Sequence, residues 1–212
     1  MFCDENTGEC AELSELTQLL IGEDVYKNAN VNLGTNRKAK LMHRFIQGIQ
    51  SDGVYLLNIS KIDERIRLGA RFLFQFEPEK VVCVGLRRNA HAPVLKFAAH
   101  TRYKAIIESF VAGTFTNPSL PTYIEPDVVL ISDPLNEAQP VLEAAEMGIP
   151  VVAICDTDSP VEYVDLVIPA NNRGRKSLAL VYWLLAREIL KLRGEIPLDT
   201  EWTVKPDEFE KM

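Results

Sequence analysis

The sequence lacks the glycine-rich signatures of the common nucleotide-binding enzymes. No G-x-G-x-x-G run follows a strand-like segment, and no G-x-x-x-x-G-K-[ST] run occurs in the 212 residues. The G-x-S-x-G elbow of α/β-hydrolases is absent too. After the strand-like run KVVCVG, Gly85 is a single isolated glycine, which is weak as a phosphate cradle. These absences exclude the standard dinucleotide, P-loop and serine-hydrolase classes.

Cysteine and histidine are scarce, with four and three residues respectively. A zinc site needs these residues in close pairs, and the sequence has no such pair. Cys83 and Cys155 lie inside apolar runs, where cysteine behaves as a small buried side chain. Cys3 and Cys10 lie in a polar N-terminal stretch. We therefore expect no metal site and no cofactor.

Long apolar runs are also missing. The longest helical one, LALVYWLLA at residues 178–186, is shorter than the roughly 20 residues that cross a bilayer. The opening stretch MFCDENTGEC has neither the basic nor the apolar region of a secretory signal. The sequence thus predicts a cytoplasmic protein without a membrane partner.

Short apolar runs alternate with helical patterns along the chain. KVVCVG, DVVLIS and PVVAIC are apolar at nearly every position, which is typical of parallel strands buried on both faces. Strands are expected at residues 54–58, 81–85, 105–110, 127–132 and 151–155, and VDLVIP (164–169) is a further strand or an extended segment beside the sheet. Helices are expected at residues 11–29, 60–76, 91–102, 137–147 and 177–193, with Ser60 capping the second and Gly148 ending the fourth.

This alternation predicts the α/β class, with three α/β/α layers and a flavodoxin-like, mostly parallel five-stranded sheet. Hydrophobic residues make up 47% of the chain and charged residues 25%, as in ordinary globular proteins. We expect a single domain over residues 1–212. It carries a helical N-terminal extension (about 1–50) and an irregular acidic C-terminal tail (about 195–212), with Trp202 as a docking anchor.

Charge is unevenly distributed along the sequence. The net charge is −7, yet residues 31–104 hold fourteen Lys or Arg against five acids. The flanking parts, residues 1–30 and 105–212, carry −6 and −10. A basic middle between acidic ends favours a polyanionic partner. The alternative is a set of solvated helix faces whose charges the acidic parts balance in space.

Carboxylates follow two of the strand-like runs directly. Asp133 follows DVVLIS, and Asp156 and Asp158 follow PVVAIC. If these strands are neighbours, the three side chains gather at the carboxyl edge of the sheet, where they could hold Mg²⁺ for phosphotransfer. Aspartate is equally favoured as a turn and cap residue, so a structural role stays open.

Three stretches resemble a known family. PDVVLISDPLNEAQPVLEAAEMGIPVVAICDTDSPVEYVDLVIPANNRGRKSLALVYWLLARE is similar to the C-terminal half of the ribosomal protein S2 family, and NVNLGT and VAGTFTNP are similar to two of its shorter motifs. Together these stretches cover roughly residues 25–210. The sequences of the motifs resemble those of archaeal members of the family. The sequence departs from the family in two places: Asn32 replaces a common His, and Glu108 and Ser109 stand where a basic residue is usual just upstream of VAGTFTNP.

The resemblance implies a structural, non-catalytic protein of the cytoplasmic small ribosomal subunit. Its partners would be small-subunit rRNA and neighbouring ribosomal proteins, with no small-molecule substrate. A Mg²⁺-dependent phosphotransfer enzyme and a metabolite-binding module that uses the GTFTN loop are the alternatives.

Residues that contact rRNA are expected in basic or small polar turns, because ribosomal proteins recognise phosphates and RNA shape. The first group resembles a mobile basic arm, and the others follow strands or precede the last helix. The predicted contacts are Arg37, Lys38, Lys40, Arg87, Arg88, Asn89, Arg102, Lys104, Thr114, Thr116, Asn117, Arg173, Arg175 and Lys176.

Overall fold

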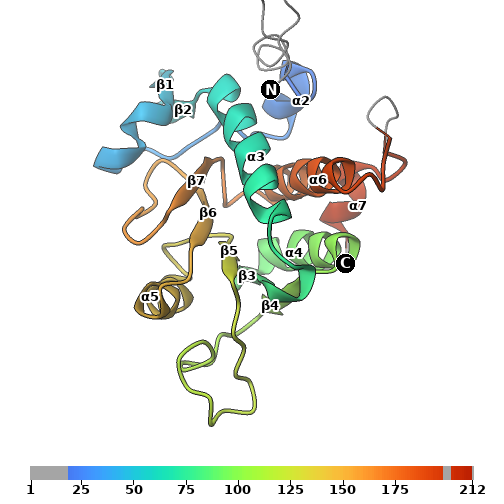
Figure 1. The fold of residues 1–212 in the computed structure, drawn as a ribbon. Helices are drawn as coiled ribbons and strands as arrows, with labels where there is room; N and C mark the ends of the chain where they lie inside the picture. The colour runs from blue at the N-terminus through green and yellow to red at the C-terminus, as the bar shows by residue number, and fades with distance from the viewer. Residues whose placement is uncertain (1–18, 198–201, 212) are drawn as a thin grey trace, which may run out of the picture.

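The computed structural model describes residues 19–197 and 202–211 (Figure 1). Cys3, Cys10 and the first part of the helix predicted at 11–29 lie outside the described residues. Within them, α2 covers only Glu23–Asn28. Residues 19–22 just before it are not helical, and there the Leu20 N–H bonds the Asp63 carboxylate and the Leu20 carbonyl accepts from Arg187.

A five-stranded, fully parallel sheet forms the centre of the fold, with strand order β4-β3-β5-β6-β7. Its middle strands are buried along their whole length because both faces are covered. The predicted α/β class and five-stranded parallel sheet are confirmed. The strands are β3 (Val81–Gly85), β4 (Lys104–Ile107), β5 (Val128–Ile131), β6 (Val151–Cys155) and β7 (Leu166–Pro169).

One strand was assigned to the wrong sheet. The run at residues 54–58 forms β2 (Tyr55–Leu57), which pairs with β1 (Ile46–Ile49) in a separate antiparallel ribbon. The VDLVIP segment takes its place as β7 at the sheet edge. Asp165 fixes this edge, since its backbone N–H bonds the Val151 carbonyl and its carboxylate accepts the Val151 N–H at 2.8 Å.

Helices cover both faces of the sheet. On one side α6 (Arg175–Leu192) packs against α3 (Ile59–Phe74) and α4 (Arg88–Thr101), while α5 (Ala138–Met147) lies on the opposite side (Figure 1). The loop between β4 and β5 is tied to α5 by Glu143, whose carboxylate accepts the Gly113 and Phe115 N–H groups at 2.6 and 3.0 Å. The three-layer prediction is confirmed.

The helix ends differ from the predictions in small ways. Asn58, not Ser60, caps α3 by accepting the Lys61 N–H. The helix predicted to begin at residue 91 begins at Arg88, so two expected turn residues lie in its first turn. Gly148 follows α5 with a φ of 70°, as predicted.

The C-terminal tail is more ordered than predicted. Residues Pro206–Glu210 form the short helix α7, with Phe209 fully buried. Trp202 anchors this tail as predicted, because its ring stacks on Trp183 at 5.9 Å and meets His100 edge-on at 5.0 Å. In residues 19–197 and 202–211, no helix has an apolar stretch long enough to traverse a bilayer.

Candidate nucleic-acid interface

The carboxyl edge of the sheet is the position where this architecture usually holds a ligand. The chain leaves β3 in one direction to reach β4, whereas β5 lies on the other side of β3. The ends of β3 and β5 therefore form the topological switch point of the sheet, beside which ligands of open α/β sheets bind. Arg87 follows β3 and Asp133 follows β5 at this point.

Protein side chains occupy the switch point. The Arg87 guanidinium pairs with the buried Asp133 carboxylate at 2.6 Å. Asp133 also accepts from the Asn172 amide at 3.1 Å, the Asn136 amide at 2.6 Å and the Leu135 N–H at 3.1 Å. This carboxylate thus joins the ends of three elements and has no free lone pair directed at an outside ligand.

Glu137 is buried beneath the same edge of the sheet. Its fully buried carboxylate accepts backbone N–H groups from Leu86, Ser132 and Asp133 at 2.8, 2.9 and 3.1 Å. Burial away from water raises the pKa of this carboxyl to about 8, although the three N–H donors oppose the shift. Glu137 therefore locks the β3 and β5 ends together.

The DTDSP turn is likewise held together by hydrogen bonds and an ion pair between protein groups. Asp156 accepts the Thr157 N–H at 2.6 Å, and the Ser159 hydroxyl accepts the Asp156 N–H at 2.9 Å. Asp158 binds the guanidinium of Arg173. Burial raises the pKa of Asp156 to about 6.

The carboxylates proposed for Mg²⁺ binding are thus used inside the fold. β5 and β6 are neighbours, as the phosphotransfer alternative required. However, Asp133 is committed to Arg87, and Asp156 and Asp158 lie beside Arg173. Across the part of the chain that the structure describes, no three His, Cys, Asp or Glu residues are grouped to hold a metal ion. The geometry favours the turn and cap interpretation of these aspartates.

We expect the buried Glu137 to make the fold less stable as the pH rises. A folded-state pKa near 8 exceeds the ordinary glutamate value of about 4.3, so the folded protein binds this proton more tightly. The free energy of unfolding should then fall as the pH is raised from 5 to 8. Urea unfolding at several pH values measures this slope.

The Glu137→Gln variant should show a flatter slope over that range, because it has no proton to lose. Glu146→Gln changes an exposed residue of α5, the helix that Glu137 directly precedes, and is the matched control. A Glu137→Gln variant whose slope equals that of the wild type would contradict the assignment.

The basic arm at residues 36–40 is docked on the DTDSP turn. Thr157 accepts the Thr35 N–H through its hydroxyl at 2.9 Å and the Ala39 N–H through its carbonyl at 2.7 Å. Gly34 lies so close to this turn that a Cβ there would be 2.4 Å from the Thr157 methyl group. The expected mobile arm is instead held at both ends by one residue.

Docking leaves the charged side chains of the arm outside. Arg37, Lys38 and Lys40 are exposed, and Lys38 lies 5.5 Å from the centre of the Tyr55 ring. None of the three forms an ion pair with a carboxylate of the described residues. The arm therefore presents uncompensated positive charge.

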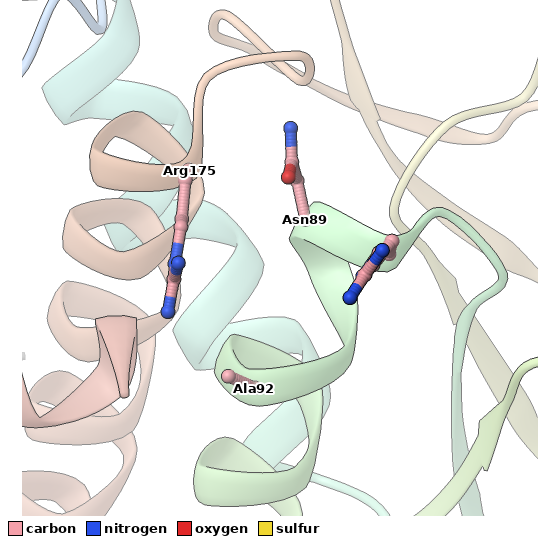
Figure 2. A pocket seen from close by; sticks show the side chains of 4 residues that line it. Asn89, Ala92 and Arg175 are labelled. Carbon is pink, nitrogen blue, oxygen red and sulfur yellow. The ribbon is translucent and has the colours of Figure 1, made fainter. Parts of the chain in front are cut away.

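A second basic surface lies between the first turns of α4 and α6. Arg88, Asn89, Ala92 and Arg175 line a hollow of about 240 Å³ (Figure 2). Arg88 is exposed and forms no ion pair within the described part of the chain. Both helices direct backbone N–H groups and the positive end of their dipoles toward this region.

The two basic surfaces are connected through hydrogen bonds. Arg173 binds Asp158 of the turn that carries the arm, and its backbone carbonyl accepts the Asn89 amide at 2.9 Å. Arg175 donates to the Glu210 carbonyl at 2.9 Å, so α7 supports the far side of the hollow. Lys176 is exposed at the next position of α6, where it lines a separate hollow with residues of α2 and α7. The arm, the DTDSP turn and the two helix starts form one continuous edge.

Not every predicted contact lies on this edge. Arg102 follows the end of α4, 3.6 Å from Glu195, and Lys104 begins β4, so both lie at the amino edge of the sheet. Thr114 is buried, and its hydroxyl donates to the Val111 carbonyl at 2.6 Å. Thr116 and Asn117 lie in the same loop, which Glu143 holds near α5.

Several residues that shape the edge were not predicted. Thr35, Thr157 and Gly34 dock the arm, Glu137 joins the strand ends, and Asn172 bonds the Asp133 carboxylate. The motifs NLGT and DTDSP were both recognised in the sequence, and they were the only indication that these residues are important. Their contact joins residues 122 positions apart, and local sequence patterns do not report such pairs.

Sequence comparison with known proteins gives matches over nearly the whole chain. The sequence model of the family described as "Ribosomal protein S2" matches residues 120–191. The "Small ribosomal subunit protein uS2" of Staphylothermus marinus is 47% identical over 207 residues, covering 98% of this chain and 94% of the relative. The chain belongs to the uS2 family. The predicted family is therefore confirmed.

Other uS2 relatives agree over nearly the same length. The protein of Saccharolobus solfataricus is 46% identical over 94% of this chain and 87% of its own. The Ignicoccus hospitalis protein is 50% identical over 89% of this chain and 90% of its own. These relatives are archaeal, as the sequence motifs indicated. Membership of a family of structural ribosomal proteins agrees with the non-enzymatic prediction.

Proposed function

We propose that this uS2 protein is a structural component of the cytoplasmic small ribosomal subunit and binds its rRNA through the carboxyl edge of the sheet. The observation that carries the proposal is that some basic residues at this edge form ion pairs with aspartates and others do not. Arg87 and Arg173 are paired with aspartates, whereas Arg37, Lys38, Lys40, Arg88 and Lys176 form no ion pair within the described residues.

Cations that have no carboxylate partner are suited to binding phosphates. The paired arginines keep the edge in shape, and the unpaired side chains carry charge into solvent. RNA binding by such a surface proceeds largely through phosphates and shape, with release of counterions. Asn89 and Arg175 add polar contacts at the hollow between α4 and α6. If Arg102 and Lys104 also contact rRNA, they would bind a second segment at the amino edge of the sheet. Thr116 and Asn117 would bind a third segment beside α5.

The affinity for small-subunit rRNA should fall steeply with salt. Five phosphate contacts give a log–log slope of about −4, so raising salt from 50 to 200 mM should weaken binding by about 100-fold or more. Titration of the purified protein against small-subunit rRNA at several salt concentrations measures this slope.

Large-subunit rRNA of similar length is the control, because it offers the same backbone without the cognate shape. Salt-independent binding, or equal affinity for both RNAs at every salt concentration, would argue against the proposed interface.

Neighbouring ribosomal proteins would occupy surfaces away from this edge.

A further inference from the structure

Strand β4 leaves one edge of the central sheet open. It pairs with β3 on one side, and no other strand among the described residues lies beside it. Its side chains Ala105, Ile106 and Ile107 are all partly exposed. An edge strand of this kind presents unpaired backbone N–H and C=O groups together with apolar side chains.

A groove runs along this open edge. It has a volume of about 440 Å³ and is lined on one side by Ala105, Ile106 and Ile107. Consecutive side chains of a strand point to opposite faces of the sheet. A hollow that touches all three must therefore reach the backbone edge between the faces.

The loop after β4 forms the other wall. Residues 121–124 and Thr114 line the groove opposite the strand, and Val111 is 48% exposed. Glu143 fixes the start of this loop through the Gly113 and Phe115 N–H groups. The start of this wall is therefore held in place by the fold.

The chemistry of the groove fits polypeptide and not RNA. No lysine or arginine lines it. Residues 108–127 carry two glutamates, one aspartate and no basic residue, whereas Lys104 lies at the start of the strand. Exposed Glu108 directly follows the strand and forms no ion pair within the described residues. The lining itself is uncharged, and the exposed acidic side chains next to it in the sequence, Glu108 and Glu125, disfavour phosphates and attract basic side chains.

We propose that an extended segment of a neighbouring small-subunit protein, carrying basic residues, adds to the sheet as a strand beside β4. Backbone hydrogen bonds to the open edge would supply affinity, and alternate side chains would reach the isoleucines and the loop wall. The proposal rests on the proposed ribosomal function, because the occupant is a neighbour in the subunit.

The groove geometry argues against a second copy of this chain. Pairing of β4 with another β4 would join two four-residue strands, and a stable dimer needs roughly 800 Å² from each partner. Residues 121–124 also line the groove together with the strand, so a second whole sheet would have to pack against this loop as well as along β4. A single extended segment needs only the strand edge.

Two substitutions at Val111 test the sign of the occupant's charge. Val111→Lys and Val111→Glu both place a charge at the groove, so they share the cost of losing the apolar side chain. Incorporation into small subunits, reconstituted from rRNA and the remaining proteins, is measured in competition with the wild type. A basic segment predicts that the lysine variant competes at least about tenfold less well than the glutamate variant.

Photocrosslinking identifies what lies in the groove. A benzophenone side chain placed at Val111 in reconstituted subunits should react with one ribosomal protein, at clustered positions within a single basic stretch. Amides of β4 should also exchange more slowly in the subunit than in the isolated protein. Crosslinks to rRNA or to another copy of this chain would overturn the proposal, as would equal competition by the two variants.

Failure of the groove proposal is distinguishable from failure of the proposed function. If the wild type binds small-subunit rRNA and enters subunits while the Val111 variants behave alike, only the groove proposal is wrong. If the wild type shows no selective rRNA binding, the proposed function itself is wrong.

Discussion

Reversing the charge of Arg88 should weaken binding to small-subunit rRNA by about tenfold and lower the magnitude of the salt slope by about 1. Arg88 lies exposed at the first turn of α4, at the hollow between α4 and α6. A glutamate at this position removes one phosphate contact and adds a negative charge that repels the phosphates. Adding Lys38→Glu on the arm should bring the loss to about 100-fold, because the two sites are separate.

Lys96→Glu is the matched control for Arg88→Glu. Lys96 is exposed on the same helix but lies about two turns from Arg88 and does not line the hollow, so rRNA affinity should stay within about twofold of the wild type. Equal losses for Arg88→Glu and Lys96→Glu would show a general charge effect and remove the case for an interface at the carboxyl edge.

Arg87 is a poor position for the same experiment. Its guanidinium is 2.6 Å from the buried Asp133 carboxylate. A glutamate at residue 87 would leave Asp133 buried without its cation and beside a second acid, which costs about 3–5 kcal/mol for a buried pair. Loss of incorporation by an Arg87 variant would therefore report the stability of the edge and not its contact with RNA.

Gly34→Ala should release the basic arm from the DTDSP turn without changing its charge. The new Cβ would lie 2.4 Å from the Thr157 methyl carbon and 2.9 Å from the Tyr55 carbonyl oxygen. Because backbone lies on one side, the arm has to move, and we expect a loss of about 1–3 kcal/mol in the free energy of unfolding. Urea unfolding and rRNA titration measure the two effects.

Displacing the arm should also lower rRNA affinity, since Arg37, Lys38 and Lys40 would no longer be held in one place. Gly22→Ala is the control, because a Cβ at that position has no atom within 4 Å. Adding Thr157→Ser to Gly34→Ala removes the nearest clash and keeps the hydroxyl that accepts the Thr35 N–H, so part of the stability should return. Unchanged stability in Gly34→Ala would mean that the arm is not docked as described.

Much of the architecture could be predicted from local sequence patterns. Runs that are apolar at every position, such as PVVAIC, predicted buried parallel strands, and β6 lies there with every residue buried. Gly148 predicted the end of α5 because a left-handed residue favours glycine. The membership of the sheet was less predictable: YLLN and VDLVIP have similar strand patterns, and the pattern does not say which one pairs with the main sheet.

The candidate site could be predicted only in part. The basic turns were visible in the sequence, and the structure brings the arm and the starts of α4 and α6 to one edge. Which cations are free was not visible. Arg87 and Arg88 are adjacent in the sequence, yet only Arg87 pairs with Asp133, because the end of β3 directs it toward the end of β5.

The sequence by itself determined the α/β class, the family and, apart from β1 and α7, the order of the strands and α-helices. These depend on periodicity, turn residues and motifs that act over a few neighbouring positions. The tertiary structure alone decided what the aspartates do. Asp133 meets Arg87 from 46 positions away and Thr157 meets Thr35 from 122 positions away. Such pairs form only when the whole sheet assembles, because packing and burial of the complete chain select them.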